Sequence, residues 1–212
     1  MNTEMLVFII EIIGTVAFAS SGAMVGIRKK MDIFGVIVMA VMTAVGGGII
    51  RDLVLGIHPP NTFKDPIYVE YSVATAVILF MIFYIRKQML DSKAMFYYER
   101  IMILLDAIGL GAFTVIGVET AYEIGFVHHR FLLLFVGVIT GVGGGMIRDM
   151  MAQQIPFILV KQIYACASLI GACVCIWLMP YHKSASMILG AVVVVIIRIL
   201  AATYRWDLPK ID

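Results

Sequence analysis

Residues 44–52 read AVGGGIIRD, and residues 141–149, which lie 97 positions further on, read GVGGGMIRD. Each nonapeptide lies inside a long apolar run. A glycine costs about 1 kcal/mol relative to alanine in a helix interior, so three in succession oppose a regular helix. A charged pair in the same run is costly unless it is paired or hydrated. Interrupted helices that carry charge in both halves of an internal repeat are typical of membrane proteins that move solutes or ions.

The composition predicts an integral membrane protein. Hydrophobic residues make up 62% of the 212 residues, and charged residues only 14%. Soluble domains contain about 25% charged residues, so this chain has too little polar surface to cover a water-soluble globule. The net charge of +2 is scattered over segment ends and forms no basic stripe, which argues against nucleic acid as a partner and leaves membrane lipid.

The chain contains seven segments that are long enough to be membrane spans, each of about 20 mostly apolar residues. We therefore expect an all-α membrane protein with a single domain, residues 1–212, and short loops. The first span carries Glu4 and Glu11 in place of a basic leader, so we expect it to be retained. The expected spans are Met5–Ile27, Ile33–Leu55, Ile67–Ile85, Ile101–Thr120, Phe131–Met151, Phe157–Met179 and Ser186–Ala202.

The basic residues predict how the chain is oriented in a cell (inner) membrane. Lysine and arginine in short loops favour the cytoplasmic side. They cluster after the first, third and seventh spans, as Arg28, Lys29 and Lys30, then Arg86, Lys87, Lys93 and Arg100, then Arg205 and Lys210. We expect a multi-pass protein with its amino terminus outside and its carboxyl terminus in the cytoplasm.

The repeat extends beyond the two nonapeptides. At a constant offset of 95, Glu11, Gly14, Ala17, Phe18 and Gly22 match Asp106, Gly109, Ala112, Phe113 and Gly117. Beyond the motifs, Pro59 matches Pro156, and we align Tyr71 with Tyr164. Repeat 1 covers about 5–86 and repeat 2 about 100–180, and an extra helix covers about 185–203. Since three spans is an odd number, the two repeats must cross the membrane in opposite senses.

The glycine triplets allow two interpretations. Glycine permits non-helical backbone, so each triplet could break its helix and line a path with backbone groups. Alternatively, the glycines allow tight contact between helices. Two triplets at equivalent positions, each followed by Arg-Asp, favour the first interpretation. The candidate path residues are Thr43, Gly46, Gly47, Gly48, Arg51 and Asp52, with Thr140, Gly143, Gly144, Gly145, Arg148 and Asp149.

The charged residues of the motifs require partners. Neighbouring residues on a helix point about 100° apart, so we expect Arg51 and Arg148 to find partners on another helix or in water rather than in the adjacent aspartate. Glu11 and Asp106 lie inside expected spans and are the candidate partners. The alternatives are an arginine that extends to the interface and, for Glu11, contact with bulk water. For Arg198, in the last span, extension to the interface is the expected arrangement.

The sequence contains none of the motifs that indicate catalysis. It has no P-loop, no metal-binding cluster and no nucleophile with an adjacent base, and the four histidines fall in expected loops. We therefore expect neither an enzyme nor a protein with a cofactor or structural metal.

With its paired Gly-Gly-Gly-x-x-Arg-Asp motifs in two three-helix repeats plus a seventh helix, the chain resembles the bacterial branch of the trimeric intracellular cation channels, the TRIC family. Bacterial members are also labelled glycine transporters. The resemblance covers residues from about Met5 to Ala202. It implies a homotrimer with a pore in each subunit, permeable to potassium and sodium, in which the second and fifth spans bend at the glycines.

Two functions are compatible with the residues. In a monovalent cation channel, backbone carbonyls of the second and fifth spans, together with Asp52 and Asp149, would favour K+ and Na+. In a secondary transporter for a small amino acid such as glycine, an arginine would bind the substrate carboxylate. The channel is the leading hypothesis and the transporter the alternative.

Overall fold

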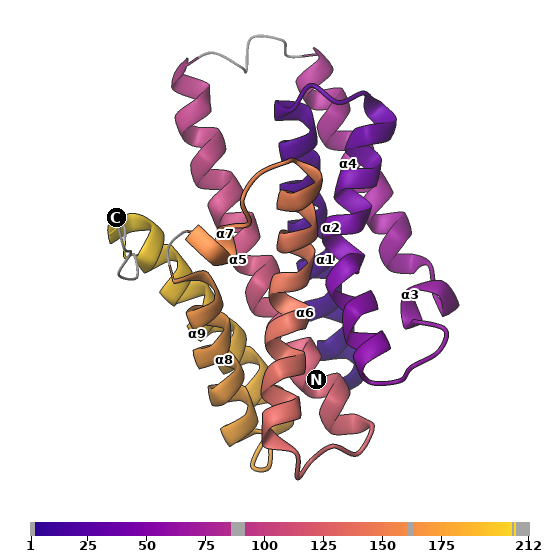
Figure 1. Cartoon of the computed structure of the whole chain (residues 1–212), viewed down its shortest axis with the longest axis vertical. Coiled ribbons are helices and arrows are strands. Elements are labelled where there is room, and N and C mark those ends of the chain that lie inside the picture. Colours follow the sequence, from indigo (N-terminus) through magenta and orange to yellow (C-terminus); the bar gives the residue numbers. More distant parts are fainter. Residues whose placement is uncertain (1–2, 86–91, 161–162, 205, 207–212) are drawn as a thin grey trace.

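The computed structural model describes residues 3–85, 92–160, 163–204 and 206. Every regular element in this part of the chain is a helix (Figure 1). Six of these helices are long and apolar enough to cross a membrane, which agrees with the expected all-α membrane fold. The helices are α1 (Thr3–Arg28), α2 (Ile33–Val54), α3 (Asn61–Lys64), α4 (Ile67–Ile85), α5 (Ser92–Glu123), α6 (Arg130–Met151), α7 (Phe157–Val160), α8 (Tyr164–Leu178) and α9 (Lys183–Tyr204).

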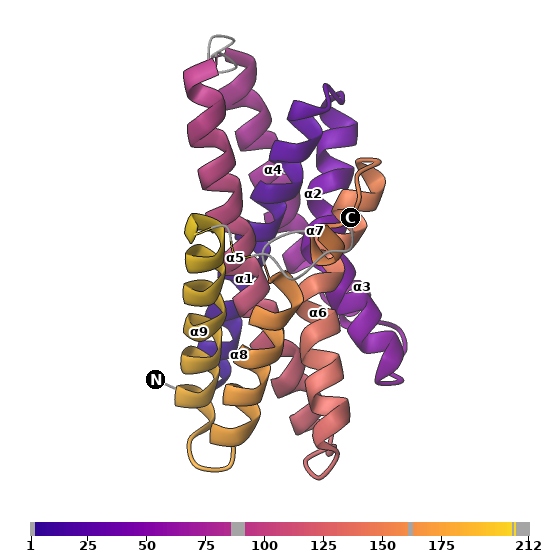
Figure 2. The same ribbon diagram turned by 60° about the vertical axis from the view of Figure 1, so that its left-hand side comes forward.

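The bundle consists of two three-helix units with opposite directions. In Figure 1, α1 runs upward from the amino terminus, whereas its counterpart α5 runs downward. The centre of the bundle is formed by α1 against α5 and α2 against α6. The unit α1, α2 and α4 is thus related to the unit α5, α6 and α8 by inversion, and α9 lies beside α8 and α5 (Figure 2).

The sixth expected span, Phe157–Met179, is not one continuous helix. The segment begins with the short α7, and α8 starts only at Tyr164, after Ile163 in a left-handed conformation with φ of 48°. The 15 residues of α8 are fewer than the roughly 20 that cross a bilayer perpendicularly. The corresponding stretch of the first repeat likewise contains a short helix, α3, before α4. Five of the basic residues, Arg86, Lys87, Lys161, Arg205 and Lys210, lie outside the described residues.

Both glycine triplets are helical, so the expected helix breaks are wrong for this conformation. The winding of α2 continues from Ile33 to Val54, and that of α6 from Arg130 to Met151. The glycines instead allow the two helices to touch: a Cβ atom placed on Gly47 would overlap the carbonyl oxygen of Thr140, and one placed on Gly144 would overlap that of Thr43. The alternative interpretation of the triplets, tight helix contact, therefore describes their central positions.

Residues at equivalent positions of the two repeats lie around this crossing of α2 and α6. The Phe18 and Phe113 rings lie 5.3 Å apart between centroids. The hydroxyl groups of Thr43 and Thr140 donate to the carbonyl oxygens of Met39 and Val136, each at 2.6 Å. The same two hydroxyl groups fill the space that a side chain would need at Gly22 and Gly117. In this conformation, the two threonines serve helix packing.

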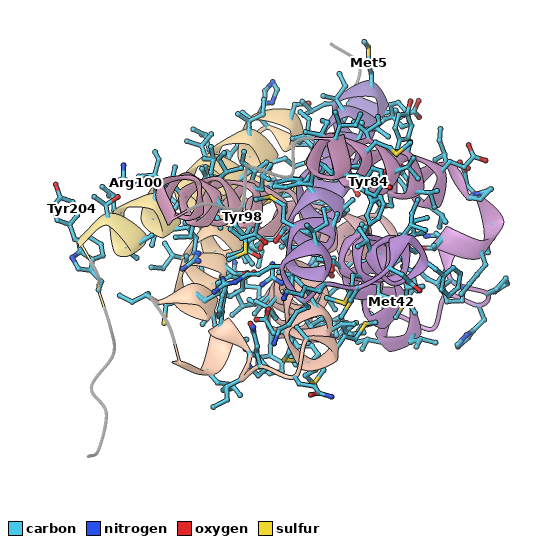
Figure 3. All side chains as sticks on the ribbon, turned by 90° about the horizontal axis from the view of Figure 1, so that it is seen from above. Met5, Met42, Tyr84, Tyr98, Arg100 and Tyr204 are labelled. Atoms are coloured by element: carbon cyan, nitrogen blue, oxygen red, sulfur yellow. The ribbon has the colours of Figure 1, made fainter. Side chains whose placement is uncertain are left out.

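At each end of the bundle, polar contacts also join neighbouring helices. Seen along the bundle, Tyr98 lies toward the middle, whereas Met5 and Tyr204 lie at the rim (Figure 3). The Tyr98 hydroxyl donates to the carbonyl oxygen of Met24, which joins the beginning of α5 to the end of α1. At the other end of the bundle, Lys183 of α9 contacts Glu119 and Glu123 of α5 at 2.8 and 2.6 Å.

The close contact of α2 with α6 predicts that substitution by alanine changes the stability of the protein differently at Gly144 and at Gly48. Gly144→Ala should lower the free energy of unfolding by about 3 kcal/mol, because the new methyl group overlaps backbone that cannot move aside. At Gly48 the nearest atom to a new Cβ would be Arg51 Nη2, at 3.9 Å, so Gly48→Ala is the matched control. It should be neutral or stabilising by up to about 1 kcal/mol through helix propensity. Thermal unfolding of both purified variants in detergent measures the difference, and equal midpoints would contradict the crossing.

Candidate functional site

Near the end of α2, Arg51 and Asp52 connect the helix to the loop that follows it. Arg51 Nε donates to Asp52 Oδ1 at 2.8 Å, and Asp52 Oδ2 accepts the backbone N–H of Asn61 at 2.7 Å. Asp52 is fully buried. Its carboxylate is therefore satisfied by one side chain and one backbone amide, which hold α3 against the end of α2.

A partly open cavity of about 300 Å³ lies beside this pair. Its lining includes Glu11 of α1, Gly48 and Arg51 of α2, and Tyr68 of α4. The Glu11 carboxylate accepts a hydrogen bond from the Tyr68 hydroxyl. Phe113, which packs against Phe18, also lines the cavity. We call Glu11, Arg51, Asp52 and Tyr68 the first half-site, and the cavity beside them the vestibule.

The second repeat builds an equivalent cluster near the end of α6. We call Asp106, Arg148, Asp149 and Tyr164 the second half-site. Arg148 Nε donates to Asp149 Oδ1 at 2.9 Å, and Asp149 Oδ2 accepts the backbone N–H of Phe157 at 2.9 Å. These two contacts reproduce those of Arg51 and Asp52 and hold α7 against the end of α6.

Arg148 makes further contacts, with Asp106 and Ser21, whereas the ion pair of Arg51 within the described residues is with Asp52. The Nη1 atom of Arg148 donates to Asp106 Oδ1 at 2.6 Å and to Ser21 Oγ at 2.5 Å. Its side chain is 1% exposed, compared with 9% for Arg51. A buried guanidinium is stable only when carboxylates and further acceptors satisfy it, and here α1, α5 and α6 all contribute. The second half-site is therefore packed closed, whereas the first faces the vestibule.

The structure corrects one expectation about these charges and confirms another. Both arginines do pair with the adjacent aspartate, contrary to expectation, because the long arginine side chain can fold back around the helix end. The expected contact across the bundle exists in the second repeat, between Asp106 and Arg148. In the first repeat, Glu11 contacts Tyr68 instead of an arginine.

The candidate path residues divide into two groups. Of the twelve motif positions, Gly48 and Arg51 line the vestibule, together with the candidate partner Glu11. The others are packed within the bundle: a side chain at Gly46 would contact Ile147, one at Gly143 would contact Ile50, and one at Gly145 would lie 2.9 Å from the Tyr164 hydroxyl. The sequence motif thus combines vestibule residues with packing residues.

Two tyrosines of the half-sites, and an arginine that contacts the second half-site, are not recognised from the sequence as site residues. Tyr68 occupies the place in repeat 1 that Tyr164 occupies in repeat 2, so the alignment of Tyr71 with Tyr164 is wrong by three positions. The signal was available, because Tyr68 lies nine residues after Pro59 and Tyr164 eight after Pro156. Arg198 is 2% exposed and does not extend to the interface; its Cζ lies 4.5 Å from the Tyr164 ring centroid.

Known proteins resemble this chain in sequence and in architecture. A family model described as Glycine transporter matches residues 8–84 and 103–180. The UPF0126 inner membrane protein YadS of Escherichia coli K12 is 38% identical over 210 residues, which cover 97% of this chain and 96% of that protein. YvgT of Bacillus subtilis 168, a UPF0126 membrane protein, is 31% identical over 202 residues, 95% of each chain.

Solved structures identify the architecture. A prokaryotic TRIC channel crystallised in 0.5 M KCl matches with a TM-score of 0.86 and 34% identity, over 97% of this chain and 100% of that one. The chain belongs to the TRIC cation channel family. A TRIC orthologue from Rhodobacter sphaeroides, described as a trimeric intracellular cation channel, matches with a TM-score of 0.83 and 31% identity, over 94% and 98% of the two chains.

Membership in the TRIC family agrees with two findings made from this chain alone. The two matched segments of the family model coincide closely with the two repeats. The all-α fold with its membrane-length helices matches that of the solved TRIC channel over the whole length of that chain.

The closed second half-site predicts that its ion pair is important for stability. Asp106→Asn should lower the free energy of unfolding by about 3 kcal/mol, because it removes a carboxylate from a buried guanidinium. Glu11→Gln is the matched control: the amide oxygen can still accept from Tyr68, and the side chain faces the vestibule, so we expect a change of about 1 kcal/mol or less. Thermal unfolding in detergent compares the two variants. A larger loss for Glu11→Gln would mean that the buried pair is not the stronger constraint.

Proposed function

We propose that each subunit is a monovalent cation channel for K+ and Na+, in which the vestibule beside α2 is the entrance to the ion path. The family relationship supports this proposal, since solved relatives are described as cation channels. The observation that carries it for this chain is the position of Glu11, a carboxylate within the apolar bundle that lines an accessible cavity.

Charge accounting explains why the vestibule would favour cations. Arg51, which lines the vestibule, is neutralised by the buried Asp52, and the lining residues Lys64 and Asp65 carry opposite charges. Glu11 accepts its hydrogen bond from Tyr68, a neutral donor. When the buried Asp52 behind Arg51 is counted with the charged lining residues, one carboxylate remains in excess. A carboxylate in a pore mouth attracts cations and repels anions.

The conformation described here corresponds to a closed channel under this proposal. Beyond the vestibule, an ion would meet Phe113 against Phe18, then the contact between Gly47 and Gly144, and then the packed second half-site. Opening would require α2 and α6 to separate at the glycine crossing. Glycine suits such a movement, because it tolerates a change in backbone angles at little steric cost.

The assembly and orientation follow from the family and from the sequence. We propose a homotrimer in the membrane lipid of the cell (inner) membrane, as the description of the Rhodobacter orthologue suggests. The amino terminus would face outward and the carboxyl terminus the cytoplasm, following the distribution of lysine and arginine. In this orientation the vestibule opens outward and the second half-site lies toward the cytoplasm.

A second candidate, a transporter of a small amino acid such as glycine, is favoured by one specific observation. The vestibule presents both the Arg51 guanidinium and the Glu11 carboxylate, which are complementary to the two charges of a zwitterion. A cavity that is open at one end and closed at the other is also what alternating access requires. The description of the family model agrees with this function.

Recordings from purified protein in a planar bilayer distinguish the two functions. A cation channel gives discrete current steps. In a KCl gradient, its reversal potential lies close to the equilibrium potential of potassium rather than that of chloride. A transporter gives no such steps, and instead shows saturable uptake of labelled glycine into vesicles that is accelerated by glycine on the opposite side. Saturable uptake without current steps would overturn the channel.

For the channel we expect Glu11→Gln to lower the permeability of potassium relative to chloride several-fold, because the vestibule loses its excess carboxylate. The reversal potential in a KCl gradient should therefore lie closer to zero for Glu11→Gln than for the unmodified protein. Asp32→Asn is the matched control: Asp32 caps α2 by accepting from Gly35 N at 2.7 Å, and asparagine is an equally good cap. An unchanged reversal potential for Glu11→Gln would remove Glu11 from the ion path.

A further inference from the structure

The seventh helix adds a charge to only one of the two half-sites. α9 lies outside the repeat, so Arg198 has no counterpart in the first half of the chain. Its side chain is 2% exposed, although it belongs to a helix whose other faces carry many exposed apolar residues. A buried arginine on an apolar helix is costly unless it is satisfied by carboxylates or aromatic rings.

The contacts of Arg198 end on the second half-site. Its Nη2 atom lies 3.9 Å from Asp106 Oδ2, and its guanidinium carbon lies 4.5 Å from the centroid of the Tyr164 ring. The other oxygen of Asp106 accepts from Arg148 at 2.6 Å. The Tyr164 hydroxyl, in turn, is the nearest atom to a side chain placed on Gly145. Arg198 thus connects α9 through α8 and α5 to the glycine triplet of α6.

The two half-sites differ in charge as a result. In the second, Asp106 and Asp149 face Arg148 and Arg198, so carboxylates and guanidinium groups balance. In the first, Asp52 pairs with Arg51, and Glu11 accepts its hydrogen bond from the neutral Tyr68, so two carboxylates stand against one guanidinium. The balanced half-site is packed, and the half-site with the excess carboxylate borders the vestibule.

We propose that Arg198 is the positioning residue that keeps the second half-site closed and so makes the two ends of the ion path unequal. Its guanidinium neutralises Asp106 and holds the Tyr164 ring in place. Tyr164 then remains against Gly145, and α6 remains against α8. Without this cation, Asp106 and Tyr164 would resemble Glu11 and Tyr68, and Arg148 would border a cavity as Arg51 does. That the second half-site lies on an ion path rests on the proposed function; its closure by Arg198 does not.

The closure is tested by chemical access, which requires no conduction. In a background with Cys166, Cys173 and Cys175 replaced by alanine, Ser21→Cys places a thiol beside Arg148, at a position that is fully buried. A charged methanethiosulfonate reagent should modify this thiol slowly in the purified protein. Adding Arg198→Gln should accelerate the modification about tenfold, the order expected when a desolvated cation–π contact is lost.

Two variants of α9 separate the role of Arg198 from general loosening of the helix. Arg198→Lys keeps the charge and should stay closer to the parent rate than Arg198→Gln. Lys183→Gln removes the cation that α9 presents to Glu119 and Glu123 at its opposite end, and should leave the rate unchanged. The proposal would be overturned if the thiol in Arg198→Gln were modified no faster than in the parent protein, or if Lys183→Gln accelerated the modification equally.

A charge-neutral variant keeps the test decisive if Arg198→Gln does not fold. Arg198→Gln combined with Asp106→Asn removes one charge of each sign and leaves Arg148 paired with Asp149. This double variant should also expose the Ser21→Cys thiol, and a parent rate would contradict the proposal. In bilayer recordings, Arg198→Gln should increase the fraction of time that the channel is open. Absence of current in the unmodified protein would refute the channel, while the modification rates would still decide the role of Arg198.

Discussion

The contact between Gly47 and Gly144 constrains the rest of the molecule, because it fixes the distance between the two repeats. With no side chain at either position, α2 and α6 approach until each meets a backbone carbonyl of the other, those of Thr140 and Thr43. Lipid provides little hydrophobic driving force for helices to associate, so close packing of this kind contributes strongly to their association. The position of each Arg-Asp pair, one turn beyond the crossing, follows directly from this contact.

The charged residues are stabilised by different means at the two ends. Each aspartate of the motifs receives its neighbouring arginine and a backbone N–H from the following loop, so that part is common to both repeats. The first arginine then borders a cavity, where water can satisfy its remaining donors. The second is enclosed and depends on Asp106 and Ser21. Equivalent sequences thus acquire different hydration through the helices that cover them.

The sequence was sufficient to predict most of the helices, the inverted repeat and the pairing of an intramembrane carboxylate with a motif arginine, because apolar runs and repeated motifs record these features. It left open whether Asp106 or Glu11 is the partner, and the structure shows Asp106 with Arg148. It did not predict the continuous winding at the glycine triplets. Glycine is compatible both with a broken helix and with close contact, and the choice depends on what lies opposite, here Thr140. Arg198 was misjudged for a similar reason, since its surroundings come from α5 and α8, which are distant in the sequence.

An inverted repeat by itself gives two equivalent ends, whereas a gated path requires that they differ in energy. The additional helix provides such a difference, because α9 packs mainly against α5 and α8 of the second repeat and contacts the first repeat much less, at α1. Through Arg198 it contributes a charge as well as apolar surface. The free energy that separates two conformations of this kind is small compared with the total packing energy, so under the role we propose for Arg198 one buried cation would be enough to decide which end is closed.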